Sequence, residues 1–225
     1  MSLVYIEKIP SNLRTAFENT VKAICSDLGI KNPDWLMIVM WAESRLNPQA
    51  RNPKGTATGL IQFLESTAKD LGTSTAALYK MNHVQQLPYV REYLRRRIKE
   101  RGVPKDAYQL YFLVHFPIAF GKADNTVLYS KGTTAYNSNP LDYNADGVVT
   151  VAEVKLFLNK ALPVGYDKTN LTTGSISSQT GRALLWIIGI SFFVATGYFI
   201  VRPDSWQAVK GLIKDFFKQT IKVFK

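Results

Sequence analysis

A single carboxylate, Glu43, closes an apolar helical segment that begins at Trp35. Apolar side chains occupy positions 35, 36, 38, 39, 41 and 42, so the glutamate is expected at the end of a buried helix. Loss of water around a carboxylic acid favours its protonated form, which can give a proton to a departing oxygen. We therefore take Glu43 as the candidate general acid. The alternative is an ion pair of Glu43 with Arg45 or Arg51 at the helix end.

The acidic segment 142–153, DYNADGVVTVAE, has the spacing of a twelve-residue calcium loop. Oxygen ligands stand at alternate positions, Gly147 stands at the turn, and a glutamate closes the loop, a pattern that suits calcium better than magnesium. The expected ligands are the side chains of Asp142, Asn144 and Asp146, the carbonyl of Val148, Thr150 directly or through water, and both oxygens of Glu153. The alternative is a polar turn that leads into a helix.

Only one of the two helices that would flank this loop is convincing in the sequence. The exit helix, 150–162, has a clear apolar pattern, whereas turn formers such as Gly132 and Pro140 precede the loop. The sequence contains no second loop of this kind. We therefore expect one structural Ca²⁺ that fixes the end of the domain and does not act as a sensor.

The motifs that follow residue 35 resemble, in order, those of the soluble lytic transglycosylases, relatives of goose-type lysozyme. They are Glu43-Ser44, then Pro48 and Ala50, then Gly59-Leu60-Ile61-Gln62-Phe63. The resemblance implies that Glu43 is the catalytic acid and that the glycan cleft includes Ser44, Gly59, Gln62 and Phe63. A glycine at 59 also permits a positive φ or a close approach of the backbone. Alternatively, Gly59 starts a helix that continues to Leu71.

The third motif of this family, Ala-Tyr-Asn followed by glycine, has two candidates. The first is Ala135-Tyr136-Asn137, although Ser138 follows it and its separation from the acid is longer than usual for the family. On this assignment Tyr136 and Asn137 contact the substrate, and calcium would position Tyr136.

The second candidate for the third motif is the segment 107–121, which would bring Tyr111 or His115 near the cleft. Lysozyme-like proteins of tailed phages show a similar arrangement, in which an apolar segment precedes an Ala-Tyr pair and a calcium-type loop. The resemblance covers about residues 20–160.

The reaction class follows from one plausible acid without an obvious partner carboxylate nearby. Glycoside hydrolases generally use two carboxylates. The resemblance implies a lytic transglycosylase, in which one glutamate protonates the oxygen between MurNAc and GlcNAc and then deprotonates the muramoyl 6-hydroxyl. If Glu65, Asp70 or Asp106 folds back to supply a second carboxylate, the reaction becomes the hydrolysis of a muramidase.

The C-terminal part of the sequence has the features of a membrane module. Residues 183–201 form a nineteen-residue run without charge, long enough to span roughly 30 Å of hydrocarbon as a helix, and a basic amphipathic segment, 202–225, follows. Residues 166–182, rich in Ser, Thr and Gly, are expected to be a flexible linker. The alternatives are a buried core helix for the apolar run and a helix that packs on another protein for the tail.

Residues 1–165 are expected to form one mainly helical, lysozyme-like domain. The expected helices are 11–29, 33–44, 60–71, 84–100, 107–120 and 150–162. A small sheet near the cleft is compatible with this pattern.

The charge and the cysteine content narrow the range of partners. The formal net charge is +11, and the basic cluster at 91–101 is expected to be a solvated helix face, with attraction to an anionic cell wall as the alternative. No motif that reads bases is present, so nucleic acid is not expected as a partner. Cys25 stands alone, which excludes a disulfide framework, and His83 and His115 are too far apart for a zinc site.

A location follows as a hypothesis. The first residues lack a basic region followed by an apolar stretch, so no secretory signal peptide is expected. We expect a virion-borne enzyme with its domain facing peptidoglycan, its C-terminal anchor in a lipid bilayer and other virion proteins as neighbours. The density of Lys and Arg in the tail predicts that the tail lies on the inner side of the membrane. The rival is a non-catalytic virion structural protein that keeps the fold.

Overall fold

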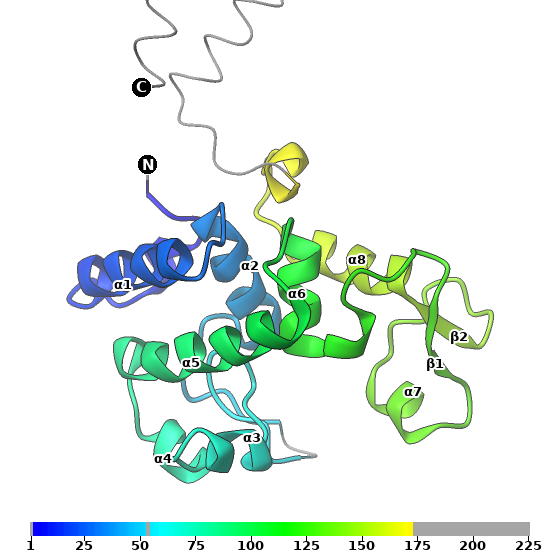
Figure 1. Ribbon diagram of the computed structural model, residues 1–225, viewed down its shortest axis with the longest axis horizontal. Helices are drawn as coiled ribbons and strands as arrows, with labels where there is room; N and C mark the ends of the chain where they lie inside the picture. Colours follow the sequence, from blue (N-terminus) through cyan, green and yellow to red (C-terminus); the bar gives the residue numbers. More distant parts are fainter. Residues whose placement is uncertain (1, 53–54, 173–225) are drawn as a thin grey trace, which may run out of the picture. The chain divides into compact units, whose positions relative to one another are not determined.

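The computed structural model describes residues 2–52 and 55–172, and these residues form a mainly helical domain (Figure 1). The helices and strands are η1 (Ile6–Lys8), α1 (Arg14–Asp27), α2 (Pro33–Ser44), α3 (Glu65–Asp70), α4 (Thr75–Tyr79), α5 (His83–Arg101), α6 (Ala107–His115), η2 (Pro117–Ala119), β1 (Val127–Ser130), α7 (Thr134–Ser138), β2 (Val148–Thr150), α8 (Val151–Lys160) and η3 (Lys168–Leu171). The mainly helical fold expected from the sequence is confirmed.

Helix α2 is the centre of the domain. The side chain of Asn32 accepts a hydrogen bond from the Asp34 N–H at 3.0 Å, and Pro33 occupies the first turn, so the sequence specifies where the helix begins. Residues 35–40 are completely buried because α2 packs against α1, α6 and α8. The helix ends where Arg45 and Leu46 adopt positive φ angles of 56° and 59°. An apolar helix buried on all sides therefore carries Glu43 in its last turn.

The helix predicted at 60–71 is shorter than expected, and this prediction is corrected. Helix α3 covers only Glu65–Asp70. Gly59 and Gln62 have positive φ angles of 84° and 53°, which are incompatible with a right-handed helix, and Thr58 pairs instead with Arg51 and Phe63 through isolated bridges. The segment before α3 is therefore a tight turn, and it leads into a lobe formed by α3 and α4.

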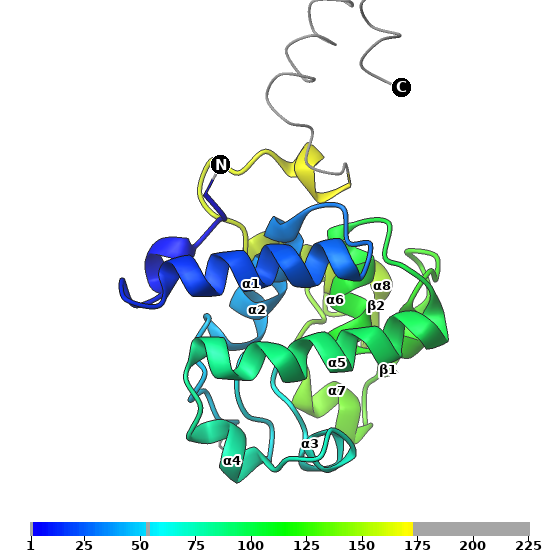
Figure 2. The ribbon, with the colours of Figure 1, turned by 60° about the vertical axis from the view of Figure 1, so that its left-hand side comes forward.

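Helix α5 runs beside α1 and carries the α3/α4 lobe at its beginning (Figure 2). Its N-terminus is fixed by a capping box in which Asn82 and Gln85 satisfy each other's backbone N–H groups. The expected basic cluster lies on this helix. Arg95 and Arg96 both bind Glu92, and Arg91 binds Asp27, with closest N–O distances of 2.7 to 2.8 Å on an exposed surface.

Helix α6 also ends earlier than the predicted 107–120. It stops at His115, because Phe116 is extended (φ −152°, ψ 80°) before Pro117, and a 3₁₀ turn follows. A short antiparallel hairpin then pairs Tyr129 of β1 with Val149 of β2, and α7 lies between the two strands in the sequence. We call residues 124–150 the hairpin lobe (Figure 1).

The linker predicted at 166–182 is wrong for its first residues. Residues 168–171 form η3, with Leu171 fully buried, and the Asn170 carbonyl accepts hydrogen bonds from Trp35 Nε1 at 2.6 Å and Asn32 Nδ2 at 3.3 Å. The chain is therefore fastened to the start of α2 as far as residue 171. The rest of the linker, the predicted transmembrane helix 183–201 and the tail 202–225 lie outside the described residues. Among the helices of residues 2–52 and 55–172, none has the length and apolar character needed to cross a bilayer.

Candidate active site

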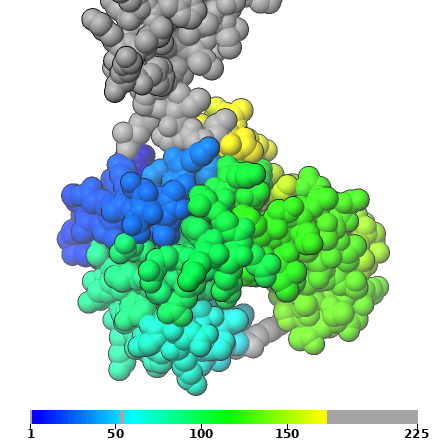
Figure 3. Space-filling model, viewed as in Figure 1, coloured from blue at the N-terminus to red at the C-terminus, as the bar shows by residue number. Residues whose placement is uncertain are grey.

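Glu43 lies where the two lobes of the domain meet. Its side chain is 13% exposed, and its Oε1 atom is buried without a hydrogen-bond partner among the described residues. Figure 3 shows the surface hollowed between the α3/α4 lobe and the hairpin lobe. The next residue, Ser44, is bonded to the turn before α3, and Tyr129 of the hairpin lobe lies close enough to sense the Glu43 charge. A substrate in this hollow would be flanked by both lobes.

The partner of Glu43 at ion-pair distance is a histidine and not an arginine. His115 Nδ1 lies 3.7 Å from Glu43 Oε1. The two arginines considered in the sequence analysis are directed at aromatic rings: Arg45 lies 5.1 Å from the centre of the Trp41 ring and Arg51 lies 4.3 Å from that of Tyr79. The ion pair expected as the alternative for Glu43 is therefore not formed with either of them.

Three tyrosines from different elements surround the glutamate. Burial raises the pKa of Tyr111 well above its usual value, and the charge of Glu43 and a hydrogen bond to it raise this pKa further. Burial raises the pKa of Tyr129 to about 12, with a contribution from Glu43. Burial also raises the pKa of Tyr93, and Glu43 again contributes. The three phenols are therefore neutral at ordinary pH, and Tyr111 can donate a hydrogen bond to a carboxylate at residue 43.

Ser44 connects helix α2 to the turn that follows. Its hydroxyl donates to the carbonyls of Met40 at 3.0 Å and Leu60 at 2.9 Å, and the residue is 8% exposed. Since both contacts are with the protein backbone, Ser44 holds the Gly59–Phe63 turn against the end of α2. Its predicted contact with substrate stays a prediction.

Gly59 is required by its surroundings. Its φ is +84°, and a Cβ atom at this position would lie 2.5 Å from Gln86 Oε1. Gln86, fully buried on α5, accepts a hydrogen bond from the Leu60 N–H at 2.9 Å and donates to the carbonyls of Pro48 and Leu78 at 2.7 and 2.8 Å. One buried carboxamide thus holds three loop segments together, and the glycine makes room for it. Gln86 was not predicted from the sequence, in which the one indication of its role is a polar residue directly before the apolar Leu87.

Gln62 and Phe63 differ in their access to the cleft. Gln62 is partly exposed, and its Nε2 donates to the carbonyls of Gly59 at 3.0 Å and Ala50 at 3.3 Å. Phe63 is 2% exposed and packs edge-on against Tyr93, with ring centres 6.3 Å apart. Gln62 can therefore meet a ligand directly, while Phe63 supports the turn from beneath.

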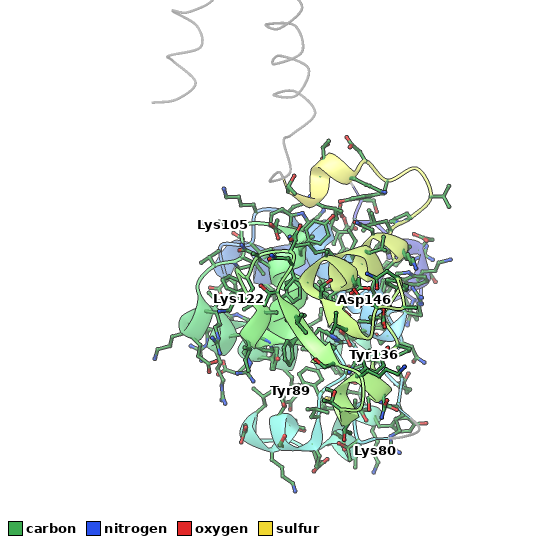
Figure 4. The ribbon with its side chains drawn as sticks, turned by 90° about the vertical axis from the view of Figure 1, so that its right-hand side faces the viewer. Lys80, Tyr89, Lys105, Lys122, Tyr136 and Asp146 are labelled. Carbon is green, nitrogen blue, oxygen red and sulfur yellow. The ribbon has the colours of Figure 1, made fainter. Side chains whose placement is uncertain are left out.

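The two candidates for the third motif occupy different places. Tyr136, on α7, donates a hydrogen bond to Asp142 Oδ2 at 2.6 Å, and Figure 4 shows it beside the loop that carries Asp146. That hydrogen bond is the main reason why the pKa of Tyr136 is raised. Asn137 is exposed. Tyr111 and His115 of α6 are the residues that face Glu43, so the geometry favours α6 as the counterpart of the third motif.

The segment 142–153 has the backbone of a tight acidic loop. Gly147 has φ +87°, and its N–H donates to Asp142 Oδ2 at 2.9 Å, while the Asp146 N–H donates to Asn144 Oδ1 at 3.2 Å. The hydrogen bond from Tyr136 is the largest influence that lowers the pKa of Asp142. The loop is therefore closed by hydrogen bonds to its own side chains.

The oxygen ligands expected from this loop fit calcium in type and order, but the carboxylates among them accept hydrogen bonds from other groups of the protein. Glu153 Oε2 accepts from the N–H of Thr150 at 2.8 Å and from its hydroxyl at 3.0 Å, and Oε1 accepts from the Tyr143 N–H at 2.9 Å. Within the part of the chain that the structure describes, no three His, Cys, Asp or Glu side chains form a group able to hold a metal ion. The calcium ligands, including Val148, stay a prediction from the sequence.

The carboxylates proposed as a second catalytic group have structural partners. Glu65 accepts hydrogen bonds from the N–H and the hydroxyl of Thr75, and this bonding lowers its pKa. Asp106 is the N-cap of α6 and accepts from the Gln109 N–H at 2.7 Å. Asp70 is the last residue of α3 and is exposed. Glu65 and Asp106 therefore accept hydrogen bonds that stabilise the fold.

Comparison with known proteins gives one match. Residues 29–102 match the family model "Transglycosylase SLT domain", a family of lytic transglycosylases that cleave the glycosidic bonds of peptidoglycan. No curated protein and no solved structure matches the chain. The matched residues include Glu43, Ser44, Gly59 and Gln62, and the match ends before α6. The segment 29–102 is therefore similar to the transglycosylase SLT domain, and it contains Glu43.

Proposed function

We propose that Glu43 acts first as the acid and then as the base in the non-hydrolytic cleavage of the MurNAc-GlcNAc bond. The observation that carries this proposal is the position of Glu43: it lies inside the family match, is 13% exposed, and its charge is felt by the phenols of Tyr93, Tyr111 and Tyr129. Tyr111 can donate a hydrogen bond to the carboxylate that forms when Glu43 gives up its proton, and so stabilise it.

The proton balance needs one carboxyl group. Glu43 gives its proton to the oxygen between the sugars, the bond from C1 of MurNAc to that oxygen breaks, and the departing sugar leaves as an alcohol. The Glu43 carboxylate then takes the proton of the muramoyl 6-hydroxyl, whose oxygen bonds to C1 and closes the anhydro ring. No water is consumed, and Glu43 ends protonated. The structural partners of Glu65 and Asp106 support this scheme over the two-carboxylate hydrolysis of a muramidase.

The test is mass spectrometry of the muropeptides that the full-length protein, in detergent, releases from purified peptidoglycan. We expect anhydro-muramoyl ends with the wild type and a loss of about 10²–10⁴-fold in rate with Glu43→Gln. Glu7→Gln, on a side chain that is 61% exposed, is the matched control and should be fully active. Reducing ends would instead indicate a muramidase, and full activity of Glu43→Gln would refute the role of Glu43.

We also propose that Ca²⁺ binds the loop 142–153 as a structural ion. Asp142, Asn144, Asp146, the Val148 carbonyl, Thr150 and Glu153 would hold it, and the bound charge would neutralise the acidic loop. Calorimetric titration of the full-length protein with CaCl₂ should show one site that MgCl₂ fills only weakly. Asp146→Ala should abolish this heat, whereas an unchanged titration in the variant would place calcium elsewhere.

Finally, we propose that the enzyme is held at a membrane by residues 183–225 and serves a virus when it crosses the cell wall. The support is the uncharged run 183–201, the basic tail 202–225 and the resemblance to lysozyme-like proteins of tailed phages. Deleting residues 176–225 should release the protein from the membrane fraction without loss of peptidoglycan cleavage. Absence of the protein from purified virions would exclude the viral role.

A further inference from the structure

Arg51 lies beside the turn that precedes α3, and the backbone around it is fixed to that turn. The carbonyl of Ala50 accepts hydrogen bonds from the Gly59 N–H at 2.9 Å and from Gln62 Nε2 at 3.3 Å. Arg51 itself pairs with Thr58 through an isolated bridge. Since Gln62 is the residue of this turn that can meet a ligand directly, Arg51 places a cation next to the candidate substrate contact.

The side chain of Arg51 is exposed and lies over an aromatic ring. Its Cζ is 4.3 Å from the centre of the Tyr79 ring, within the range of cation–π attraction, and Tyr79 is itself 41% exposed. A hydrogen bond of 2.8 Å from Gln49 Nε2 to the Met81 carbonyl joins the segment before Arg51 to the segment that follows α4. The fold therefore holds the guanidinium and the ring together, which lowers the entropy that the arginine loses when it binds a ligand.

The charge of Arg51 is not neutralised by the part of the chain that the structure describes. No carboxylate of residues 2–52 and 55–172 lies at ion-pair distance from its guanidinium. Four arginines of α5, residues 91 and 95–97, differ in this respect, because each binds a carboxylate at 2.7 to 2.9 Å. Arg51 is thus an ordered cation that is able to take its anion from a ligand.

The anion that suits Arg51 is a carboxylate. A planar guanidinium offers pairs of N–H donors that match the two oxygens of a carboxylate. The sugar rings of peptidoglycan are uncharged, but the lactyl group of MurNAc carries either a free carboxylate or a peptide with free carboxylates. The acidic substituent of MurNAc is therefore the part of the substrate that Arg51 can distinguish.

We propose that Arg51, held over Tyr79, binds a carboxylate carried by MurNAc, so that the enzyme prefers glycan strands with acidic substituents. This inference rests on the proposed function, which supplies peptidoglycan as the substrate. Gln62 contacts the sugar chain, and Arg51 contacts the substituent beside it. Because this substituent does not react, Arg51 stabilises the bound substrate and the transition state alike and determines specificity without taking part in the chemistry.

The first experiment measures binding without turnover. Full-length Glu43→Gln protein in detergent is sedimented with purified peptidoglycan at about 0.15 M salt, with Arg51→Gln or Arg101→Gln as a further change. We expect Arg51→Gln to weaken binding about tenfold, because it removes a charge-assisted hydrogen-bonded pair. Equal binding by the two variants overturns the proposal.

Arg101→Gln is the matched control, since it removes the same charge from the last residue of α5. Helix α4 lies at the beginning of α5, about 27 Å away along the helix axis, so this change should alter binding by less than about twofold. Arg51→Lys keeps the charge but not the paired donors, and it should recover only part of the lost affinity.

The second experiment changes the substrate. Coupling of the carboxyl groups of peptidoglycan to methylamine removes their charge, and the Arg51→Gln and Arg101→Gln proteins should bind this material equally. A tenfold difference that persists would show that Arg51 acts through the fold or through another contact, and it would overturn the proposal.

The source of the carboxylate is identified with glycan strands from which an amidase has removed the peptides. These strands are added as competitors for binding to intact peptidoglycan. Competition that is weakened by Arg51→Gln supports a contact with the lactyl carboxylate. Competition that is the same for both variants, combined with the tenfold difference on intact peptidoglycan, supports a contact with the peptide.

A failure of this inference is distinguishable from a failure of the proposed function. Reducing ends in the released muropeptides would refute the proposed mechanism and leave the Arg51 comparison intact. Equal binding by the Arg51 and Arg101 variants would refute the contact and leave the mechanism intact. If neither the wild type nor any variant bound peptidoglycan, both proposals would be refuted.

Discussion

The family-matched segment 29–102 and the segment 104–172 contribute to the site in opposite ways. The first provides Glu43, the proposed acid, and fixes it with buried structure: an apolar helix, a glycine turn and the Gln86 carboxamide. The second lies beyond the match, yet it provides His115, Tyr111 and Tyr129, which surround the carboxylate. The position of the acid and its chemical surroundings therefore come from different parts of the chain. Changes to the residues of the first segment that support Glu43 should reduce stability, and changes to the residues of the second that surround it should alter activity at nearly constant stability.

The largest loss of stability is expected from Gln86→Ala. The change leaves the Leu60 N–H and two carbonyls buried without their partner, which costs about 3–5 kcal/mol, a large part of the stability of a typical domain. Denaturant unfolding of the full-length protein measures it. Lys99→Ala, on the exposed face of the same helix, is the control and should cost less than about 0.5 kcal/mol.

Gly59→Ala should cost somewhat less, about 2–4 kcal/mol. The new Cβ would meet a carboxamide that three hydrogen bonds hold in place, and alanine is strained at φ +84°. In a Gly59→Ala, Gln86→Ala double variant the clash disappears, so the combined loss should be smaller than the sum of the two single losses. Additive losses would mean that the glycine is required for its φ alone.

Tyr129→Phe should have the smallest effect on stability at neutral pH, about 1 kcal/mol or less. Because burial raises the pKa of Tyr129 to about 12, compared with about 10 for an unfolded chain, its contribution is complete below pH 10 and is lost as the pH rises through 12. Thermal unfolding between pH 9 and 12 should therefore show a shallower decline for the variant. An equally steep decline would mean that Tyr129 does not ionise in this range before the domain unfolds.

The parts of the fold that were predictable are those whose sequence carries its own signals. Helix α2 was predicted at 33–44 and is found there, because a capping Asn, a proline and an apolar run define it. The turn at 59–63 was mistaken for a helix, because its positive φ at Gln62 has no sequence signature. The hairpin is too short to show an alternating pattern. The early residues of the predicted linker fold because Trp35, distant in sequence, provides a donor for Asn170.

The candidate site was predictable to the same extent. Glu43 and the Gly59–Phe63 turn lie within 21 residues, and the motifs that made them candidates by resemblance fall inside the matched segment 29–102. His115 could be placed near the cleft only as one of two options, since nothing local in a single sequence shows which helix returns to the acid. Tyr129 was missed because its contact with His115 depends on the hairpin, which tertiary structure alone creates.

Because η3 is attached to the start of α2 and Glu43 lies in its last turn, the two are separated by most of the length of this helix. Asn170 is bonded to Trp35, and Glu43 lies eight residues further along the same helix, about 12 Å away along its axis. Figure 1 shows η3 on the opposite side of the domain from α3, α4 and α7, the elements beside the hollow. A glycan strand that enters the hollow does not have to pass the last described residues of the chain. The buried helix thus acts as a rigid spacer between η3 and Glu43.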